Sequence, residues 1–221
     1  MVADAAAQDR ILLAAGGIYR TTNPKDNTYG EGLARVGDEN GILIETVDLI
    51  SYLDRLRLTP ALDRRIPALV RDSLESEPDL CLGCNISGQN LVNRPAWRAL
   101  FDQIAARPQL AVRLAATMQD EARSLGSRIA MDFGVRLSSL RLIQQINFEI
   151  INIDRSFVHA AERSATGGDY FADIVSFASN YAPLVVVEEV ETVSDLERAR
   201  AGGTTHVQGH YFVPLFDTVR D

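Results

Sequence analysis

Two aspartates each follow a short apolar run in the middle of the chain. The first run, Ile129–Met131, ends at Asp132, and the second, Phe148–Ile153, ends at Asp154. Apolar runs of this length are typical of buried strands. In a parallel α/β fold the carboxyl ends of the strands carry catalytic or ligand-binding groups, and carboxylate oxygens are the ligands that hard cations such as Mg²⁺ need. We therefore expect both aspartates at one functional edge.

The residues between these aspartates predict a loop and a helix that separate the two strands. A Phe-Gly pair follows Asp132, and two serines can then cap a helix that begins near Leu140. That helix carries an apolar stripe at helical spacing. The stretch from Ile129 to Val158 is thus predicted to be one strand–loop–helix–strand unit.

Further apolar segments alternate with helical patterns along the rest of the chain. The predicted strands are Ile11–Tyr19, Tyr29–Val36, Leu80–Ser87, Leu110–Ala116, Leu184–Val187 and His206–Pro214. This alternation predicts an α/β fold of the (β/α)8 barrel type. The sequence contains no internal repeat or linker, so we expect a frayed terminus over 1–10 and a single barrel domain over 11–221.

Four motifs occur in order along the chain: Glu31-Gly32-Leu33 with Arg35, Asn-Ile-Ser at 85–87, IAMDFGVRLSSL from Ile129, and EEVET at 188–192. They resemble the motifs Glu-Ala-Leu-x-Arg, Asn-Leu-Ser, IALDDFGTGYSSL and Glu-Gly-Val-Glu-Thr of the EAL domain family. That family comprises cyclic di-GMP phosphodiesterases and their inactive relatives. The resemblance spans nearly the whole chain and implies a TIM-like barrel of the EAL type.

The resemblance also implies which side chains form the site. Glu31 and Asn85 stand at metal-ligand positions of the family, and Leu33 and Arg35 at positions that contact cyclic di-GMP. The alternative is an ion pair between Glu31 and Arg35 on an ordinary strand face, because alternation places both on the side of Leu33. Within the family's frame we favour the inherited site. The positions that match the family's site are Glu31, Asn85, Asp132, Asp154, Glu188, Glu191 and Gln208.

Three of the family's chemical positions are changed. One of two adjacent aspartates is missing, Arg113 falls where a metal-binding Glu is expected, and Asn152 replaces the lysine that holds the attacking water. An Arg cannot bind Mg²⁺ and stays protonated. We hypothesise that Arg113 takes the cation's place among Glu31, Asn85 and Asp154. No metal or other cofactor is then expected, although the family uses Mg or Mn.

Two further differences concern the strands around the site. Only 18 residues lie between Arg113 and Asp132, which predicts a shortened crossover between their strands. The family's first strand carries a Gln-Pro pair that touches the nucleotide, and the corresponding region here is Ala14-Ala15-Gly16-Gly17. That contact with the nucleotide is therefore expected to be lost.

These changes predict a non-catalytic, regulatory EAL-like domain in bacterial cyclic di-GMP-related signalling. It would act by interaction with a regulatory protein partner that the sequence does not identify, and residual cyclic di-GMP binding is left open. The alternative is a cyclic di-GMP receptor, which Leu33 and Arg35 favour and the lost Gln-Pro pair disfavours. An active metal-dependent phosphodiesterase is the least favoured alternative.

Composition limits the other classes of function. A net charge of −8 disfavours binding to a nucleic-acid polymer. No apolar run approaches the ~20 residues of a membrane span, so no membrane contact and a cytoplasmic location are expected. Cys81 and Cys84 form a CxxC motif, but residues three apart on a strand point to opposite faces and no second pair completes a metal site. We expect two ordinary thiols.

Overall fold

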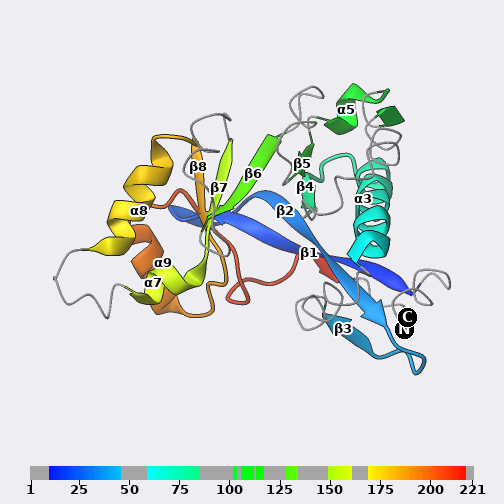
Figure 1. Ribbon diagram of the computed structural model, residues 1–221, viewed down its shortest axis with the longest axis horizontal. Helices are drawn as coiled ribbons and strands as arrows, with labels where there is room; N and C mark the ends of the chain where they lie inside the picture. The colour runs from blue at the N-terminus through cyan, green and yellow to red at the C-terminus, as the bar shows by residue number, and fades with distance from the viewer. Residues whose placement is uncertain are drawn as a thin grey trace. The chain divides into compact units, whose positions relative to one another are not determined.

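The computed structural model describes residues 10–45, 59–84, 102–103, 106–111, 113–116, 128–133, 149–160 and 169–217. These ranges contain both strands and helices, as predicted for an α/β fold, and the two kinds alternate regularly from α3 to β5 and from α8 to β9 (Figure 1). The strands are β1 (Ile11–Arg20), β2 (Asn23–Gly37), β3 (Leu43–Glu45), β4 (Leu82–Cys84), β5 (Leu114–Ala116), β6 (Arg128–Phe133), β7 (Ile150–Ile153), β8 (Leu184–Val187), β9 (His206–Val207) and β10 (Phe216–Asp217). The helices are α3 (Thr59–Ser76), α5 (Pro108–Ala111), α7 (Arg155–Ala160), α8 (Tyr170–Ser179) and α9 (Val193–Ala201).

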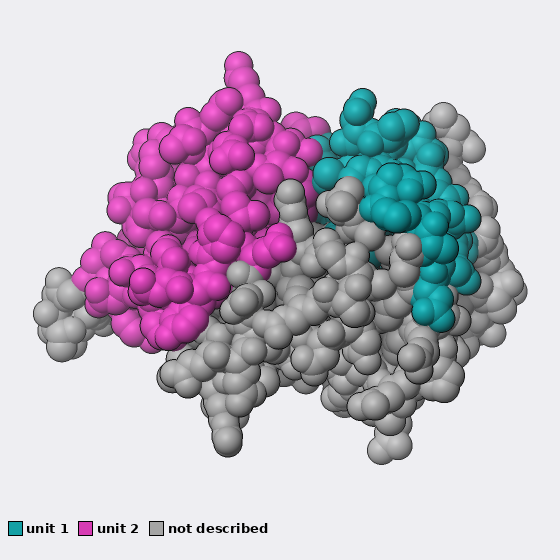
Figure 2. Space-filling view, turned by 90° about the horizontal axis from the view of Figure 1, so that it is seen from above, with its two compact units in different colours: residues 1–16, 30–127, 214–221 teal, residues 17–29, 128–213 magenta. Residues whose placement is uncertain are grey.

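Two compact units divide the chain, and Figure 2 colours them separately. Unit 1 comprises residues 1–16, 30–127 and 214–221, and unit 2 comprises residues 17–29 and 128–213. The long strands β1 and β2 each supply residues to both units. The single domain expected over 11–221 stays a prediction.

Unit 2 contains four parallel strands, of which the two central ones are apolar except for Asn152 in β7. β7 pairs with β6 on one side and with β8 on the other, and β8 also pairs with β9. All four residues of β7 are buried, and in β8 only Leu184 is partly exposed. Parallel strands that are buried on both faces have such continuous runs of Val and Ile. The bounds of the strand Leu184–Val187 are confirmed.

Three helices accompany the parallel strands of unit 2. α8 packs on β8, and α7 contacts both α8 and α9 (Figure 1). α9 begins with a capping box, in which the hydroxyl of Thr192 accepts the Asp195 N–H and the carboxylate of Asp195 accepts the Thr192 N–H. After the last turn, Gly203 has a φ of 87°, the left-handed conformation that ends many helices.

Unit 1 combines a parallel set of strands with helix α3. β4 pairs in parallel with β2 and with β5, and β3 pairs with β2 in antiparallel register. α3 lies close to β2 at Gly32. A Cβ atom added to this glycine would lie only 2.9 Å from Cγ2 of Val70 in α3. A glycine at this position therefore permits the close approach of the helix to the sheet.

The predicted strand Leu110–Ala116 is wrong in its first half. Leu110 belongs to the helical turn α5, and the strand β5 begins only at Leu114. Pro108 is the first residue of α5, a position that proline favours because its φ angle suits a helix and its missing N–H costs nothing there. The strand register around Arg113 therefore differs from the predicted one.

The two ends of the chain also differ from the prediction. The closing strand predicted over His206–Pro214 ends at Val207. Arg10, which was included in the frayed terminus, donates a 2.5 Å hydrogen bond from Nη1 to the carbonyl of Gly37. Its own carbonyl accepts the Gly37 N–H at 2.8 Å. Within the described part of the chain, none of the helices has the length and apolar character needed to cross a membrane.

Candidate functional site

Three predicted site residues follow three neighbouring strands of unit 2. Asp154 comes directly after β7, Glu188 after β8 and Gln208 after β9. The backbone continues the pairing past the strand ends, since the Glu188 N–H donates to the carbonyl of Ile153 and the Gln208 N–H to that of Val187. The three side chains therefore start from one edge, at the carboxyl ends of parallel strands. This is the edge at which α/β proteins bind ligands.

Arg155 is part of this edge and was missed by the sequence analysis. Its guanidinium lies 2.5 Å from a carboxylate oxygen of Glu191, another predicted site residue. The preceding Asp154 accepts the Ser156 N–H at 2.8 Å, which fixes the start of α7. A positive charge directly after the strand-end aspartate was the available signal. Glu191 is thus held by an ion pair within the protein.

The loops after β8 and β9 are joined by backbone hydrogen bonds. The Val190 N–H donates to the carbonyl of Gln208, and the Tyr211 N–H donates to the carbonyl of Val190. A Cβ atom on Gly209, whose φ is 151°, would clash with backbone atoms of Val190. Glu189, where the resemblance expects glycine, has a φ of 54°. A left-handed non-glycine residue is strained, and such strain is common at functional loops.

His206 is buried in β9, next to this edge. Its Nε2 lies 2.9 Å from the hydroxyl oxygen of Thr28, and its Nδ1 lies 2.9 Å from that of Thr205. Burial lowers the pKa of His206 to about 4, and the charge of Arg20 acts in the same direction whereas Asp26 opposes it. The ring is therefore neutral at neutral pH.

The predicted signature strand lies on β2 in unit 1. Glu31, Leu33 and Arg35 are all partly exposed, whereas the alternate residues Gly32 and Ala34 are buried. The expected alternation is therefore confirmed, and the three side chains share one face. Arg35 donates from Nη1 to the carbonyl of Ala34 at 3.3 Å.

The side chain of Arg113 binds backbone carbonyls and does not take the place of a cation as we hypothesised. Its guanidinium donates to the carbonyls of Leu74 at 2.7 Å, Glu77 at 2.9 Å and Leu80 at 3.1 Å, and its Nε donates to Gln109 at 3.1 Å. Within the described residues, all of these bonds go to backbone oxygens in the last turn of α3, in the segment that follows it, and in α5. The hypothesis that Arg113 replaces a cation beside Glu31 is therefore wrong.

The reason is the register of β5. Because Leu114 is the first residue of the strand, Arg113 lies at its amino end, where the carbonyl of Arg113 accepts the Leu82 N–H. Ligand-binding groups of parallel strands lie at the opposite, carboxyl end. An Arg near a helix C-terminus satisfies the last carbonyls, which have no partner within the helix.

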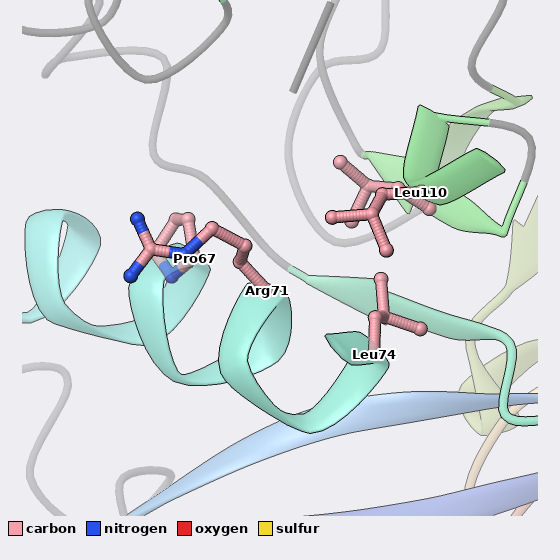
Figure 3. Close-up of a pocket in the computed structure, with 5 residues that line it drawn as sticks. Pro67, Arg71, Leu74 and Leu110 are labelled. Carbon is pink, nitrogen blue, oxygen red and sulfur yellow. The ribbon is translucent and has the colours of Figure 1, made fainter. Parts of the chain in front are cut away.

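A shallow hollow beside α3 carries no predicted site residue. Figure 3 shows Leu74 from α3 pointing toward Leu110 from α5, with Arg71 extended along the same helix beside Pro67, and Leu114 completes the lining. Arg71 is the single charged side chain of this lining, and its guanidinium donates to Asp72 and Gln103. The hollow is thus an apolar packing defect of unit 1. Cys81 is partly exposed and Cys84 is buried, and neither forms a disulfide, as expected of two ordinary thiols.

The described part of the chain does not cover every predicted site residue completely. Asn85 lies outside it, and for Asp132 only the backbone is described, with its Cα opposite that of Asn152. Among the described side chains, no group of three or more His, Cys, Asp or Glu residues is arranged to hold a metal ion. The absence of a metal from the site therefore stays a prediction.

Comparison with known proteins identifies the family. A family model described as the EAL domain matches residues 2–214. This chain belongs to the EAL domain family. The EAL fold is also that of two solved structures. An EAL domain protein from Listeria monocytogenes has a TM-score of 0.79 at 21% identity, covering 96% of this chain and 91% of that one. The FimX EAL domain from Pseudomonas aeruginosa, bound to c-di-GMP, has a TM-score of 0.77 at 16% identity, covering 96% and 94%.

Curated proteins that are similar to this chain are longer. The cyclic di-GMP phosphodiesterase PdeF of Escherichia coli is 27% identical over 130 residues, which make up 57% of this chain and 17% of PdeF. This chain spans between 14% and 24% of the length of three such relatives. The α/β, TIM-like barrel of the EAL type is confirmed as the fold. The predicted shortened crossover falls at 117–127, outside the described residues.

Asn152, which the sequence analysis predicts at the position of the EAL family's lysine, lies within β7. Only 6% of Asn152 is exposed, and its Cα lies opposite those of Asp132 on β6 and Val186 on β8. Strand alternation puts Asn152 and Asp154 on the same face of the sheet. A neutral amide thus stands two residues before the aspartate at the strand's carboxyl end.

Proposed function

We propose that this EAL domain is non-catalytic and regulates bacterial cyclic di-GMP signalling through a protein partner. The observation that carries the proposal is the burial of Asn152, a neutral amide at the position where the sequence predicts the family's lysine. Hydrolysis of a phosphodiester needs an activated water and stabilisation of the developing negative charge. An amide is neither a base nor a cation, and it contributes little to either requirement.

Strand β5 supports the same proposal without any role for Arg113. Its three residues are Leu114, Ala115 and Ala116, and the sequence has no Asp or Glu between 110 and 119. An acidic metal ligand from this strand is therefore lacking whatever the register. Because hard cations need several oxygen ligands, we propose that no divalent metal is held here at working concentrations.

The proposed place of action is the bacterial cytoplasm, and the proposed context is cyclic di-GMP signalling. PdeF is named a cyclic di-GMP phosphodiesterase, and the FimX domain was solved with c-di-GMP bound. We propose that this chain shares their signalling system. The regulatory partner is a protein, and no nucleic-acid polymer or membrane is involved.

A second candidate function is that of a cyclic di-GMP receptor. The observation that favours it is the partly exposed face of β2, which presents Glu31, Leu33 and Arg35 together. A guanidinium can donate two parallel hydrogen bonds to a phosphate and supply a charge. Binding of the nucleotide at this face would not require groups that activate water, so a receptor is compatible with the proposed lack of catalysis.

Calorimetric titration of cyclic di-GMP into the purified chain, with and without Mg²⁺, separates these functions. The recovered nucleotide is then analysed for the linear product. Unchanged nucleotide without heat of binding fits a module that acts through its partner. Binding that is independent of Mg²⁺ and leaves the nucleotide intact fits the receptor. Formation of the linear dinucleotide would contradict both non-catalytic proposals.

A further inference from the structure

Tyr19 folds back over Gly17 on strand β1. The two residues are two apart on a strand and so lie on the same face. A Cβ atom built on Gly17 would lie 2.5 Å from the Tyr19 hydroxyl oxygen and 2.6 Å from two carbons of its ring. The ring of Tyr19 therefore fills the space in which any side chain at position 17 would have to lie.

Phe212 covers the other side of this ring. The centroids of the Tyr19 and Phe212 rings are 4.5 Å apart at an interplanar angle of 22°, which is a stacked arrangement. Tyr211 meets Phe212 edge-on, at 5.1 Å and 90°. The hydroxyl of Tyr19 donates to the carbonyl of Val213 at 3.2 Å. Two aromatic rings are thus stacked in parallel, and the loop after β9 supplies one of them.

The register of β1 places this stacked pair at the carboxyl edge of the parallel strands of unit 2. β1 runs antiparallel to β9, with Tyr19 opposite Val207 and Arg20 opposite His206. Moving back along β1 from Tyr19 to Gly17 therefore leads past the carboxyl end of β9. The same end carries Gln208, beside Glu188 and Asp154 on the neighbouring strands.

The surroundings of the pair allow Tyr19 to leave its place. Its ring is partly exposed, and its hydrogen bond to the carbonyl of Val213, at 3.2 Å, is long for a hydroxyl donor. The neighbouring Tyr211 and Val213 are 41% and 81% exposed. A rotation of Tyr19 about its χ angles would uncover one face of Phe212 and the glycine beneath.

An uncovered face of Phe212 at this edge would favour one class of ligand, a nucleotide base. Bases of nucleotides stack on aromatic side chains, with little dependence on sequence, because every base has a π-face. The place that Tyr19 occupies on Phe212 has the separation and the near-parallel orientation of such a stack. A purine ring could stack on Phe212 in the same way once Tyr19 had moved.

We propose that Tyr19 occupies a purine-stacking position on Phe212, so that a guanine nucleotide which binds at this edge must displace it. The inference rests on the proposed function in that cyclic di-GMP is the nucleotide tested. Tyr19 then acts as a competitor within the chain and keeps the affinity of the resting protein low. A partner that draws the loop 209–213 away from β1 would raise that affinity.

The test is calorimetric titration of cyclic di-GMP into the full chain and its variants. Tyr19→Ala removes the competitor and is expected to bind at least fivefold more tightly than the unchanged protein. Tyr19→Phe keeps the ring but loses the bond to Val213, and an intermediate gain is expected. Phe212→Leu, combined with Tyr19→Ala, removes the stacking partner and should cancel the gain.

Tyr181→Ala is the matched control, because it removes another partly exposed tyrosine of unit 2, whose ring lies 5.0 Å from that of Phe177. It should leave the affinity unchanged. Thermal unfolding of each variant verifies that it is folded. If Tyr19→Ala does not fold, Tyr19→Phe takes its place in the test. Equal or weaker binding by a folded Tyr19 variant overturns the inference, as does failure of every folded variant to bind. Neither result touches the proposed lack of hydrolysis, which is measured separately from the linear product.

Discussion

The guanidinium of Arg113 and the carbonyl of Leu74 are joined by a 2.7 Å hydrogen bond across 39 residues of sequence. Two further carbonyls after the same helix accept from Arg113, so this side chain ties the end of α3 to the start of β5. Its role is structural. The loss of catalysis that we propose therefore rests on the lack of acids in β5 and on Asn152.

Replacing Arg113 by alanine should destabilise the protein by about 2 kcal/mol, because charge-assisted hydrogen bonds to several carbonyls are lost at once. Arg113→Lys should recover part of this, since one ammonium cannot reach all of these oxygens in the geometry of a guanidinium. The measurement is urea unfolding. Arg107→Ala, which removes a surface ion pair with Glu75, is the control and should cost less than about 1 kcal/mol. Equal effects of the two alanine variants would refute the role assigned to Arg113.

Replacing Glu189 by glycine should stabilise the protein by about 1 kcal/mol. Its φ of 54° is costly for a residue with a Cβ atom, and glycine adopts it freely. The same substitution at the exposed, helical Glu197 in α9 is the control, and it should destabilise by about 1 kcal/mol. Both changes are measured from denaturant midpoints. Destabilisation by Glu189→Gly would mean that contacts of the glutamate outweigh the backbone strain.

Acidification should weaken the fold through His206. Its pKa in the folded protein is about 4, below the value of 6.5 in an unfolded chain. Between these values the unfolded chain binds the extra proton, so the stabilisation is complete above about pH 6.5 and is lost as the pH falls toward 4, with a slope of at most about 1.4 kcal/mol per pH unit.

Urea unfolding at several pH values between 4 and 7 measures this dependence. His206→Gln should have a flatter profile over that window, because the titrating group is gone. His210→Gln, at an exposed position, should keep the profile of the unchanged protein. Parallel profiles for the His206 variant and the unchanged protein would assign the acid sensitivity to other groups.

Arg35→Ala should weaken cyclic di-GMP binding at least tenfold if the chain is a receptor. The guanidinium lies on the partly exposed face of β2 and would contribute a charge and hydrogen bonds to a phosphate. Titration calorimetry gives the affinity, and Arg107→Ala is a control of equal charge. An unchanged affinity in Arg35→Ala would remove this face from the binding site.

The strands that the sequence predicted well are those whose signal is local. Leu184–Val187 is a run of apolar, mostly β-branched residues in a parallel sheet, so its length and its end at Glu188 follow from the residues themselves. The alternation around Leu33 is equally local. These two elements place Glu188, Glu31 and Arg35 as expected.

The sequence-based predictions are wrong where contacts between residues far apart in the chain determine the local structure. LAVRLAA has the pattern of a strand, but Pro108 opens a helical turn and the bonds of Arg113 to α3 fix the register of β5. The residues near Arg113 in the sequence do not predict its contact with Leu74, which lies 39 positions away. Likewise the sequence showed two glycines before Tyr19 but not the ring that covers Gly17, because Phe212 and Val213 are supplied from nearly 200 residues away.

The most direct test of the central claim is a single-turnover experiment, with the protein in excess over cyclic di-GMP in Mg²⁺ or Mn²⁺. Our account predicts that the nucleotide is recovered intact after prolonged incubation, in both metals. Release of the linear dinucleotide by the unchanged protein, and its loss in Glu31→Gln, would contradict the account and make this chain an active phosphodiesterase.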